Sequence, residues 1–422
     1  MHDWVYDLRR RVDALTGGVE RAAARLADYV DWSTWQSGRP TVLCLDRALF
    51  RKDLHEMRKW TNLNLVPVRA TQVKRFQNPW VAPRWRRQTF LAHDLTDQLE
   101  HVAPFLEHFG CTFLEAVQRK HPVDAVMAAN TDYWQDEALK LACLKLNIPF
   151  LVLSRESYGI GRGREYVSDV YQRAKFDFIG AGCAVASDRC ETYLSSCGSL
   201  DHAVVQVTGW PRYDAWLDQP LKPQCERTAI TLMGYADPSA VQYAAGNFAD
   251  TFKEFVAVAW AHKAATPSSD LRFVVKLKKQ RDAAWLDQIV PGYQLSGISV
   301  TADMPLPDLL ADSRIAIGYN TLAVLEALLA DTAVVVPCWG DSKRDQHRSL
   351  VHYENSQDQQ VCYFPMSPQE FRALLEQAVT GALQPKGTRE QRLERFSLHS
   401  KVDQNRRASN EVEKFILSFL PS

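Results

Sequence analysis

Short apolar runs rich in β-branched residues alternate with amphipathic stretches, and this alternation limits the fold more than any other feature of the chain. Strands joined by helical crossovers lie parallel within one sheet. In the first half, one such helix is expected at Trp134 to Leu146. The strands predicted in this half are Thr41 to Leu45, Leu63 to Val68, Val123 to Ala128, Phe150 to Leu153, Phe176 to Ala181 and Val204 to Val207. This half therefore predicts an α/β fold with a parallel sheet.

The alternation restarts after a polar stretch. Residues 217–227 carry two prolines, and their composition is typical of a linker between domains. Beyond them, helices are expected at Val241 to His262 and at Leu322 to Leu329. The strands predicted in this half are Ala229 to Met233, Arg272 to Leu277, Arg314 to Ile317 and Ala333 to Pro337. Because 422 residues exceed what one hydrophobic core usually holds, we expect two Rossmann-like domains.

These signals divide the chain into four parts. We expect an N-terminal domain over residues 1–216, a linker over 217–227 and a C-terminal domain over 228–408. The remaining residues, 409–422, include a predicted helix at Asn410 to Leu420. We expect this helix to pack back on the N-terminal domain.

Composition excludes several classes of protein. The 50 basic and 50 acidic residues cancel, so the chain has no overall field to attract nucleic acid. The nine cysteines form no CxxC pair and the eleven histidines form no HExxH motif, which argues against a disulfide framework and a metal site. The sequence shows no signal peptide and no apolar span, so a cytoplasmic location is expected.

The helix predicted after the strand ending at Ile317 begins with small and polar residues. Asn320 and Thr321 lie at its start, where free backbone N–H groups and the helix dipole favour a phosphate. Glu326 lies further along the same helix, where its carboxylate could accept hydrogen bonds from ribose hydroxyls. The alternative is an ordinary helix cap with Glu326 facing solvent.

Two other strand ends in this half could contact a nucleotide. Lys276 and Lys278 belong to a cationic segment at the end of the strand beginning at Arg272, and such charges would stabilise a phosphate leaving group. A solvated strand end is the alternative. Gly234 follows the first strand of this half, where a glycine lets backbone approach a ligand closely.

The first half offers a candidate base with two rivals. Glu156 lies in a polar, glycine-rich loop, Ser154 to Gly163, that follows a buried strand. A carboxylate there could take the proton from an acceptor hydroxyl. It could instead pair with Arg155 or Arg162 in a purely structural loop. Asp46 and Asp132 also follow strands of this domain and are rival candidates.

The segment Arg69 to Arg87 interleaves basic residues with Phe76, Trp80 and Trp85 and contains no acidic residue. Such a composition favours an anionic acceptor or contact with membrane headgroups, so peripheral contact with the inner membrane is one reading. Single-stranded nucleic acid is disfavoured because the protein is neutral and shows no RNA-binding motif. A plain surface loop is the third reading.

Four motifs of the chain, taken in order, resemble those of GT-B glycosyltransferases. They resemble most the bacterial surface-polysaccharide group that includes capsule Kdo transferases and CDP-glycerol glycerophosphotransferases. The motifs are Val207 to Asp214, Leu309 to Ser313, Tyr319 to Thr321 with Leu325 to Leu328, and Val334 to Pro337. Two positions depart from the family pattern: Lys276-Leu277-Lys278 stands where a His-Pro pair is usual, and Asp331 replaces a glycine.

The resemblance implies an inverting, metal-independent glycosyltransferase without a cofactor. It would move a sugar from a nucleotide-activated donor, a CMP- or NDP-sugar, to a surface-polysaccharide or glycolipid acceptor. The donor would bind the C-terminal domain and the acceptor the N-terminal one, with Gly209 and Arg212 near the closing cleft. Alternatives of the same fold are a CDP-polyol phosphotransferase and a non-catalytic scaffold in envelope assembly. A sugar epimerase is disfavoured because no second group of carboxylates is evident.

Overall fold

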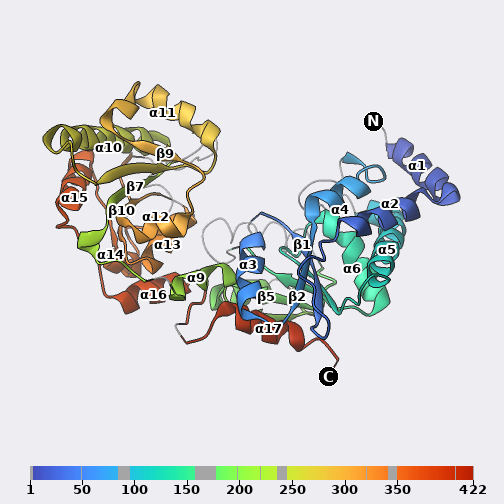
Figure 1. The fold of residues 1–422 in the computed structure, drawn as a ribbon. Helices are drawn as coiled ribbons and strands as arrows, with labels where there is room; N and C mark the ends of the chain where they lie inside the picture. Colours follow the sequence, from blue (N-terminus) through green and yellow to red (C-terminus); the bar gives the residue numbers. More distant parts are fainter. Residues whose placement is uncertain are drawn as a thin grey trace. The chain divides into compact units, whose positions relative to one another are not determined.

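The computed structural model divides the chain into two compact units (Figure 1). The first unit contains residues 1–217 and 399–422, and the second contains 218–398. The second unit is therefore inserted into the first. The structure describes residues 3–48, 50–83, 96–156, 177–196, 198–218, 220–234, 245–319, 321–340, 349–403 and 405–421.

The first unit is built on a six-stranded sheet in the order β2-β1-β3-β4-β5-β6, and all its strand pairs are parallel. Its strands are β1 (Thr41–Asp46), β2 (Asn64–Arg69), β3 (Ala125–Ala128), β4 (Phe150–Leu153), β5 (Gly182–Val185) and β6 (Val204–Val207). The residues of β1, β3, β4 and β5 are all buried, as expected for strands covered by helices on both faces.

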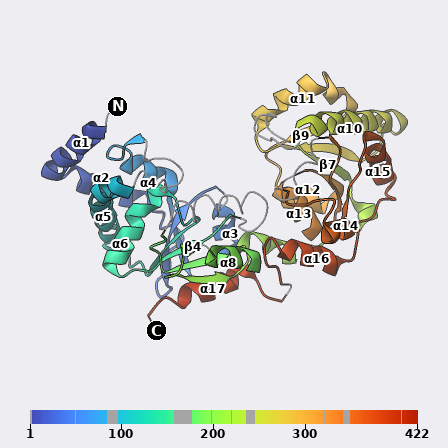
Figure 2. The same ribbon diagram turned by 180° about the vertical axis from the view of Figure 1, so that it is seen from behind.

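Helices cover both faces of this sheet. Figures 1 and 2 show α5 and α6 on one side, and α3, α8 and α17 on the other. The helices of this unit are α1 (Asp3–Thr16), α2 (Gly18–Leu26), α3 (Phe50–Trp60), α4 (Ala70–Gln77), α5 (Thr96–Gln118), α6 (Glu137–Leu146), α8 (Asp188–Ser195), α9 (Ala215–Asp218) and α17 (Ala408–Leu417). The last of them buries Val412, Phe415 and Ile416.

The second unit repeats this plan with a sheet in the order β12-β11-β10-β7-β8-β9, again with parallel pairs. Its strands are β7 (Ala229–Met233), β8 (Arg272–Lys276), β9 (Ser299–Thr301), β10 (Ser313–Ile317), β11 (Ala333–Val335) and β12 (Cys362–Tyr363). Its helices are α10 (Ala245–Ala265), α11 (Ala283–Ile289), α12 (Leu306–Ala311), α13 (Leu322–Leu329), α14 (Ser356–Val361), α15 (Pro368–Thr380) and α16 (Arg389–Ser397). One face of the sheet packs against α10 and α15 through a core that includes Phe248, Phe252 and Phe371.

The predicted α/β class is confirmed, and one predicted strand is misplaced. The strand expected at Phe176 to Ala181 lies instead at Gly182–Val185. Small residues fill this strand because α17 packs closely on it: a Cβ placed on Gly182 would lie 2.8 Å from the Phe415 ring. A preference for bulky, β-branched residues in strands therefore pointed to the wrong segment.

Candidate ligand sites at the two strand-order reversals

Each sheet has one point at which the strand order reverses. In the first unit the chain runs outward from β1 to β2 on one side, and from β3 to β6 on the other. In the second unit the reversal falls between β7 and β10. In open α/β sheets, ligands bind beyond the carboxyl ends of the strands at such a point. The loops after β1, β3, β7 and β10 are therefore the first places to search.

In the second unit, glycines follow both strands of the reversal. Gly234 follows β7, and a Cβ placed on it would lie 2.5 Å from the Leu277 side chain. Gly318 follows β10, and its Cβ would lie 2.8 Å from Val324. A larger residue at either position would clash with neighbouring side chains of the unit. Packing alone therefore explains why residue 234 is a glycine, without a ligand.

The helix after β10 begins at this reversal with a polar N-terminus. Thr321 is the N-cap of α13, has an extended backbone and makes no capping bond through its side chain. It is half-buried, and the first turn of α13 carries no acidic residue. Asn320 lies outside the described residues. A helix N-terminus that its N-cap side chain does not occupy is suited to an anion.

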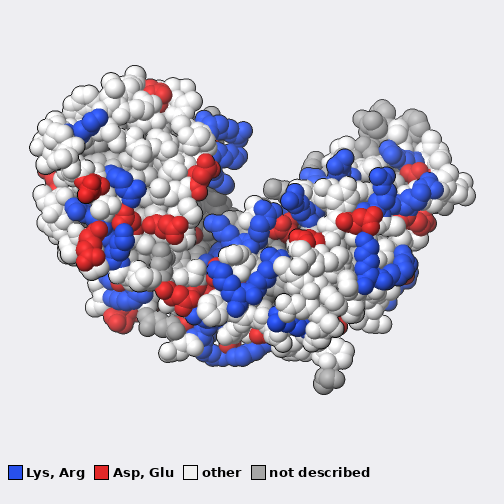
Figure 3. Space-filling model, in the orientation of Figure 1, with Lys and Arg blue, Asp and Glu red and all other residues white. Residues whose placement is uncertain are grey.

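The other predicted donor-site residues lie around the same end of the sheet. The Lys276 ammonium donates to the carbonyl oxygens of Leu277, at 3.1 Å, and Ala302, at 2.6 Å. It therefore ties the end of β8 to the segment after β9. Lys278 is exposed, and Figure 3 shows basic side chains gathered along one edge of this unit. Glu326 is half-buried on α13.

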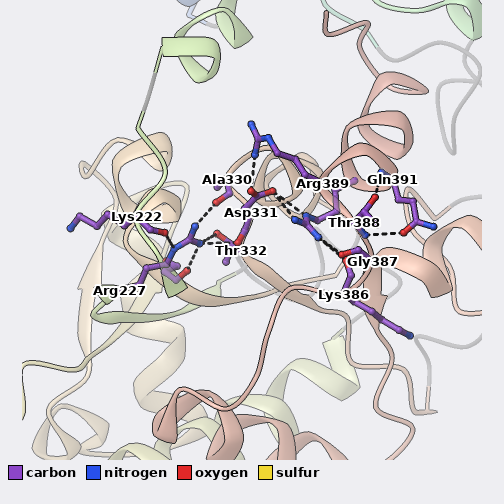
Figure 4. Close-up of polar contacts among 12 residues, drawn as sticks. Lys222, Arg227, Ala330, Asp331, Thr332, Lys386, Gly387, Thr388, Arg389 and Gln391 are labelled. Carbon is purple, nitrogen blue, oxygen red and sulfur yellow. Dashed lines mark hydrogen bonds and ion pairs between the residues drawn. The ribbon is translucent and has the colours of Figure 1, made fainter. Parts of the chain in front are cut away.

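The turn after α13 contains Asp331, one of the two positions at which the sequence departs from the glycosyltransferase motifs that it resembles. Asp331 has a φ of 50°, in the left-handed region. Its carboxylate pairs with Arg389 at 2.8 Å and Arg392 at 2.9 Å (Figure 4). On the other side of the turn, Arg227 donates to the carbonyl oxygens of Ala330 and Asp331. The Asp331 side chain thus anchors α16 to the end of α13.

In the first unit, Glu156 lies just beyond β4 and its carboxylate is partnered. Its Oε1 accepts from Arg155 Nε at 3.1 Å and from Asn130 Nδ2 at 3.4 Å. The pairing with Arg155 is the structural alternative predicted above, although 42% of the Glu156 side chain remains exposed. Arg162 lies outside the described residues.

Two buried oxygens beside Glu156 have no partner among the described residues. These are Asn130 Oδ1, after β3, and Ser154 Oγ, after β4. Both residues are at most 1% exposed. A buried polar atom without a partner costs free energy, so such atoms mark places where a ligand or water hydroxyl binds favourably. Of the rival carboxylates, Asp132 is fully buried and Asp46 pairs with Arg51 at 2.7 Å.

The sequence interpretation missed a cation at this site. Arg47 follows β1, pairs with buried Asp136 at 3.1 Å and lies over the Tyr133 ring at 4.2 Å. Burial raises the pKa of Asp136, and Arg47 opposes that rise. Burial also raises the pKa of Tyr133, whose hydroxyl accepts from Arg155. The position of Arg47 directly after a predicted strand was the sequence signal that could have identified it.

The motif from Val207 to Asp214 joins distant segments of the first unit. Gly209 has a φ of 77°, and a Cβ on it would lie 2.4 Å from the Lys401 carbonyl oxygen. The Trp210 indole donates to the carbonyl oxygen of Ser154, next to the Glu156 loop. Arg212 pairs with fully buried Asp53 of α3 at 2.7 Å.

The motif ends by capping a helix from the other end of the chain. The two carboxylate oxygens of Asp214 accept from the backbone N–H groups of Ala408 and Ser409, each at 2.8 Å. These groups open α17, whose own N-cap residue, Arg407, makes no side-chain capping bond. Gly209 and Arg212, predicted near a cleft, thus have structural contacts within their own unit.

The basic and aromatic segment is partly integrated into the first unit. Trp80 is 5% exposed and Phe76 packs on Tyr29 with ring centroids 5.5 Å apart, so neither ring stands free at the surface. Lys74 and Arg75 are exposed, whereas residues 84–95 lie outside the described part. Among the described residues, no helix is long and apolar enough to cross a membrane, and no cluster of metal-ligating side chains occurs.

Neither a protein-family model nor a curated protein sequence matches the chain. Solved structures do. A protein of Listeria monocytogenes described as a UDP-N-acetylglucosamine 2-epimerase has 13% identity and a TM-score of 0.50, over 90% of this chain and 96% of that one. A UDP-GlcNAc 2-epimerase from Neisseria meningitidis, solved with UDP-GlcNAc, has 12% identity and a TM-score of 0.47, over 90% and 100%. A glycosyltransferase from Rickettsia africae has 13% identity and a TM-score of 0.46, over 90% and 99%.

Identities this low show a common fold and not a common activity. The likeness to the Listeria protein and the two parallel sheets agree on the fold, which is GT-B with two Rossmann-like domains. The predicted fold class is confirmed.

Proposed function

We propose that the chain is a GT-B enzyme that uses a nucleotide-activated sugar, and that it acts as an inverting glycosyltransferase. The observation that carries this proposal is the start of α13 at the strand-order reversal of the second unit, where the Thr321 side chain makes no capping bond. A diphosphate or monophosphate there would accept hydrogen bonds from backbone N–H groups and interact favourably with the helix dipole. Glu326, on the same helix, would accept from ribose hydroxyls.

The acceptor would bind at the reversal of the first unit, and Glu156 would act as the base. In inverting transfer, the base takes the proton of the acceptor hydroxyl as that oxygen attacks the anomeric carbon and the nucleotide leaves. Asn130 and Arg155 hold the Glu156 carboxylate in place. The unpartnered Ser154 Oγ and Asn130 Oδ1 would contact acceptor hydroxyls. Lys278 is available to the leaving phosphate, since Lys276 already bonds two carbonyl oxygens.

A cap substitution tests the donor site. Thr321→Asp places a carboxylate at the start of α13, where it would cap the helix and repel a phosphate. We expect unliganded Thr321→Asp to melt at or above the wild-type temperature and to lose most of the stabilisation that a nucleotide gives the wild type. The measurement is a melting screen against CMP, CDP, UDP, GDP and dTDP.

Ser367→Asp is the matched control, because Ser367 already caps α15 with its side chain. It should keep the full nucleotide shift. Equal shifts in both variants would contradict a phosphate at α13, and the absence of a shift in the wild type would contradict the donor site altogether.

The catalytic role of Glu156 has its own test. Glu156→Gln keeps the shape and an acceptor oxygen but cannot take a proton, so we expect transfer to fall by about 100-fold or more. Nucleotide binding, measured by melting, should stay unchanged. A variant with near-normal turnover would remove Glu156 from the mechanism and leave its pairing with Arg155 as its whole role.

Two contacts favour a second candidate, a non-catalytic scaffold. Glu156 is ion-paired and Lys276 is bonded to carbonyl oxygens, so both already have structural partners. A scaffold without a donor site would not be stabilised by any nucleotide. A CDP-polyol phosphotransferase, in contrast, would be stabilised by CDP and would release CMP from a CDP-polyol. The glycosyltransferase proposal also includes a surface-polysaccharide or glycolipid acceptor. It further includes peripheral contact of residues 69–87 with the inner membrane.

A further inference from the structure

A pocket of about 750 Å³ lies in the first unit at the carboxyl ends of β1 and β2. Asp46 and Arg69, the last residues of these strands, are register partners and both line it. The sheet order β2-β1-β3 separates this pocket from the reversal, which lies on the β3 side of β1. Its volume is within the range of small-molecule sites. The pocket is therefore a neighbour of the Glu156 site and not the same site.

Some of the charged side chains in the pocket are paired with one another, and others are not. Three arginines and two aspartates line it. Arg51 binds Asp46 through two nitrogens, at 3.0 and 2.7 Å, so these charges offset each other. Arg58 donates to the Leu65 carbonyl oxygen at 3.0 Å. Arg69 is exposed and makes no ion pair or side-chain hydrogen bond with a described residue, which leaves its guanidinium available to an anion.

The second carboxylate of the pocket does not neutralise Arg69. Asp31 accepts from the backbone N–H of Ser33 at 3.0 Å. Hydrogen bonding to the Ser33 side chain, together with that backbone bond and the charge of Arg58, keeps the pKa of Asp31 below its ordinary value. Asp31 is thus held as a carboxylate on the loop before β1, where it can accept hydrogen bonds from hydroxyl groups.

Two further features call for a ligand with hydroxyl groups. Gln72, on α4 one turn after Arg69, has a buried Oε1 without a partner among the described residues. This oxygen can only accept a hydrogen bond, so it cannot bind a phosphate oxygen and requires a donor such as O–H. Tyr29, a residue that is 48% exposed, lines the pocket, and its ring rests on Phe76. An aromatic face among polar groups is typical of carbohydrate-sized sites.

We propose that this pocket binds a phosphorylated sugar, with its phosphate on Arg69 and a sugar hydroxyl donating to Gln72. A guanidinium matches phosphate in geometry and charge, because it donates two parallel N–H bonds. The inference rests on the proposed function and deepens it: the acceptor carries a phosphate, which this pocket holds beside the Glu156 site.

Titration calorimetry on the full chain tests the proposal with three probes: glucose 1-phosphate, glucose and inorganic phosphate. Glucose 1-phosphate should bind more tightly than either of the others, because only it engages both groups. Arg69→Gln should weaken its binding roughly tenfold or more, the usual effect of losing a charge-assisted hydrogen bond. Arg75→Gln is the matched control, since Arg75 is exposed on α4 and does not line the pocket. It should change binding less than twofold.

A second variant distinguishes a loss of ligand binding from a loss of stability. Gln72→Met removes the buried acceptor and keeps an unbranched side chain. We expect several-fold weaker binding of glucose 1-phosphate with a melting temperature equal to or above that of the wild type. Weaker binding only in variants that melt at a lower temperature would overturn the proposal.

The remaining outcomes separate this inference from the proposed function. Glucose 1-phosphate that does not bind the wild type, or binds Arg69→Gln and Arg75→Gln equally, would overturn the pocket assignment even if nucleotides stabilise the protein. Glucose binding as tightly as glucose 1-phosphate would also overturn it. If glucose 1-phosphate binds through Arg69 but no nucleotide stabilises the wild type, the donor proposal fails and the pocket stands.

Discussion

At the residue scale, the Arg212–Asp53 pair is the clearest case of a predicted site residue with structural contacts. The side chain of Asp53 is fully buried and that of Arg212 is 6% exposed. Since neither charge is well solvated, each is stabilised by its partner. Burial is the largest influence on Asp53 and raises its pKa, whereas Arg212 lowers it. Removing the guanidinium would leave a buried carboxylate without its counter-charge.

We therefore predict that Arg212→Met destabilises the protein by about 3 to 5 kcal/mol at neutral pH. Without Arg212 the pKa of Asp53 rises further, so the carboxyl takes up a proton at a higher pH than in the wild type. A raised folded-state pKa means that the deficit is largest above that pKa and shrinks as the pH falls through it. Urea unfolding at pH 8 and at pH 5 measures this difference.

Arg406→Met is the matched control, because it breaks a pair in which Arg406 is 58% exposed and Glu411 keeps Lys414 as a second partner. The loss there should stay below about 1 kcal/mol. Equal losses in the two variants, or a deficit for Arg212→Met that grows toward acid pH, would contradict the argument.

Residue roles were harder to predict than residue positions. The sequence placed Glu156 and Thr321 after the correct strands and Lys276 at the end of β8, because short apolar runs indicate where a strand ends. It could not show that Lys276 bonds the Ala302 carbonyl oxygen, since that contact depends on the packing of β9, which has only three residues. Arg47 was missed for a similar reason: its partners lie some 90 residues away in sequence.

At the scale of elements, α17 depends on a cap supplied from far away in the sequence. We predict that Asp214→Ala, which removes both acceptors of the Ala408 and Ser409 N–H groups, destabilises the helix by about 1 to 2 kcal/mol. Hydrogen exchange monitored by mass spectrometry should show faster exchange within residues 408–417. Asp214→Asn keeps one acceptor and should have an intermediate effect.

Ser367→Ala provides the comparison in the other unit, since it removes the cap of α15 in the same way. It should speed exchange in α15 and leave α17 unchanged. Wild-type exchange of α17 in Asp214→Ala would mean that burial of its apolar face alone holds the helix.

The elements also show where prediction from sequence succeeds and where it fails. β4, β6, β7 and α13 have the bounds predicted from their apolar runs. β5 was misplaced because its small residues make room for α17, and no local pattern records a contact between residues 182 and 415. The strand order, and with it the reversal points, follows from long-range pairing and is absent from the sequence pattern.

At the scale of the whole molecule, the insertion of the second unit into the first has a testable effect. Residues 218–398 contain every strand of the second sheet, so we predict that this segment folds alone with a single cooperative transition. Residues 1–217 lack α17, whose Val412, Phe415 and Ile416 are at most 1% exposed. We expect this fragment to bind a hydrophobic dye and to aggregate.

The rescue experiment joins residues 399–422 to residue 217 through a short flexible linker. This chain should regain cooperative unfolding and lose dye binding, measured by circular dichroism and fluorescence. The prediction fails if residues 1–217 alone unfold as cooperatively as the joined chain.

Because the chain returns to the first unit at residue 399, the first unit is completed only after the second during synthesis. The first unit leaves the ribosome earliest, but the groove over Gly182 stays open until the segment carrying Phe415 has been translated. The inserted unit can reach its native state in the meantime, because it needs nothing from that segment. Nascent chains therefore carry an unfinished N-terminal half through most of translation, which exposes that half to chaperones and to premature association.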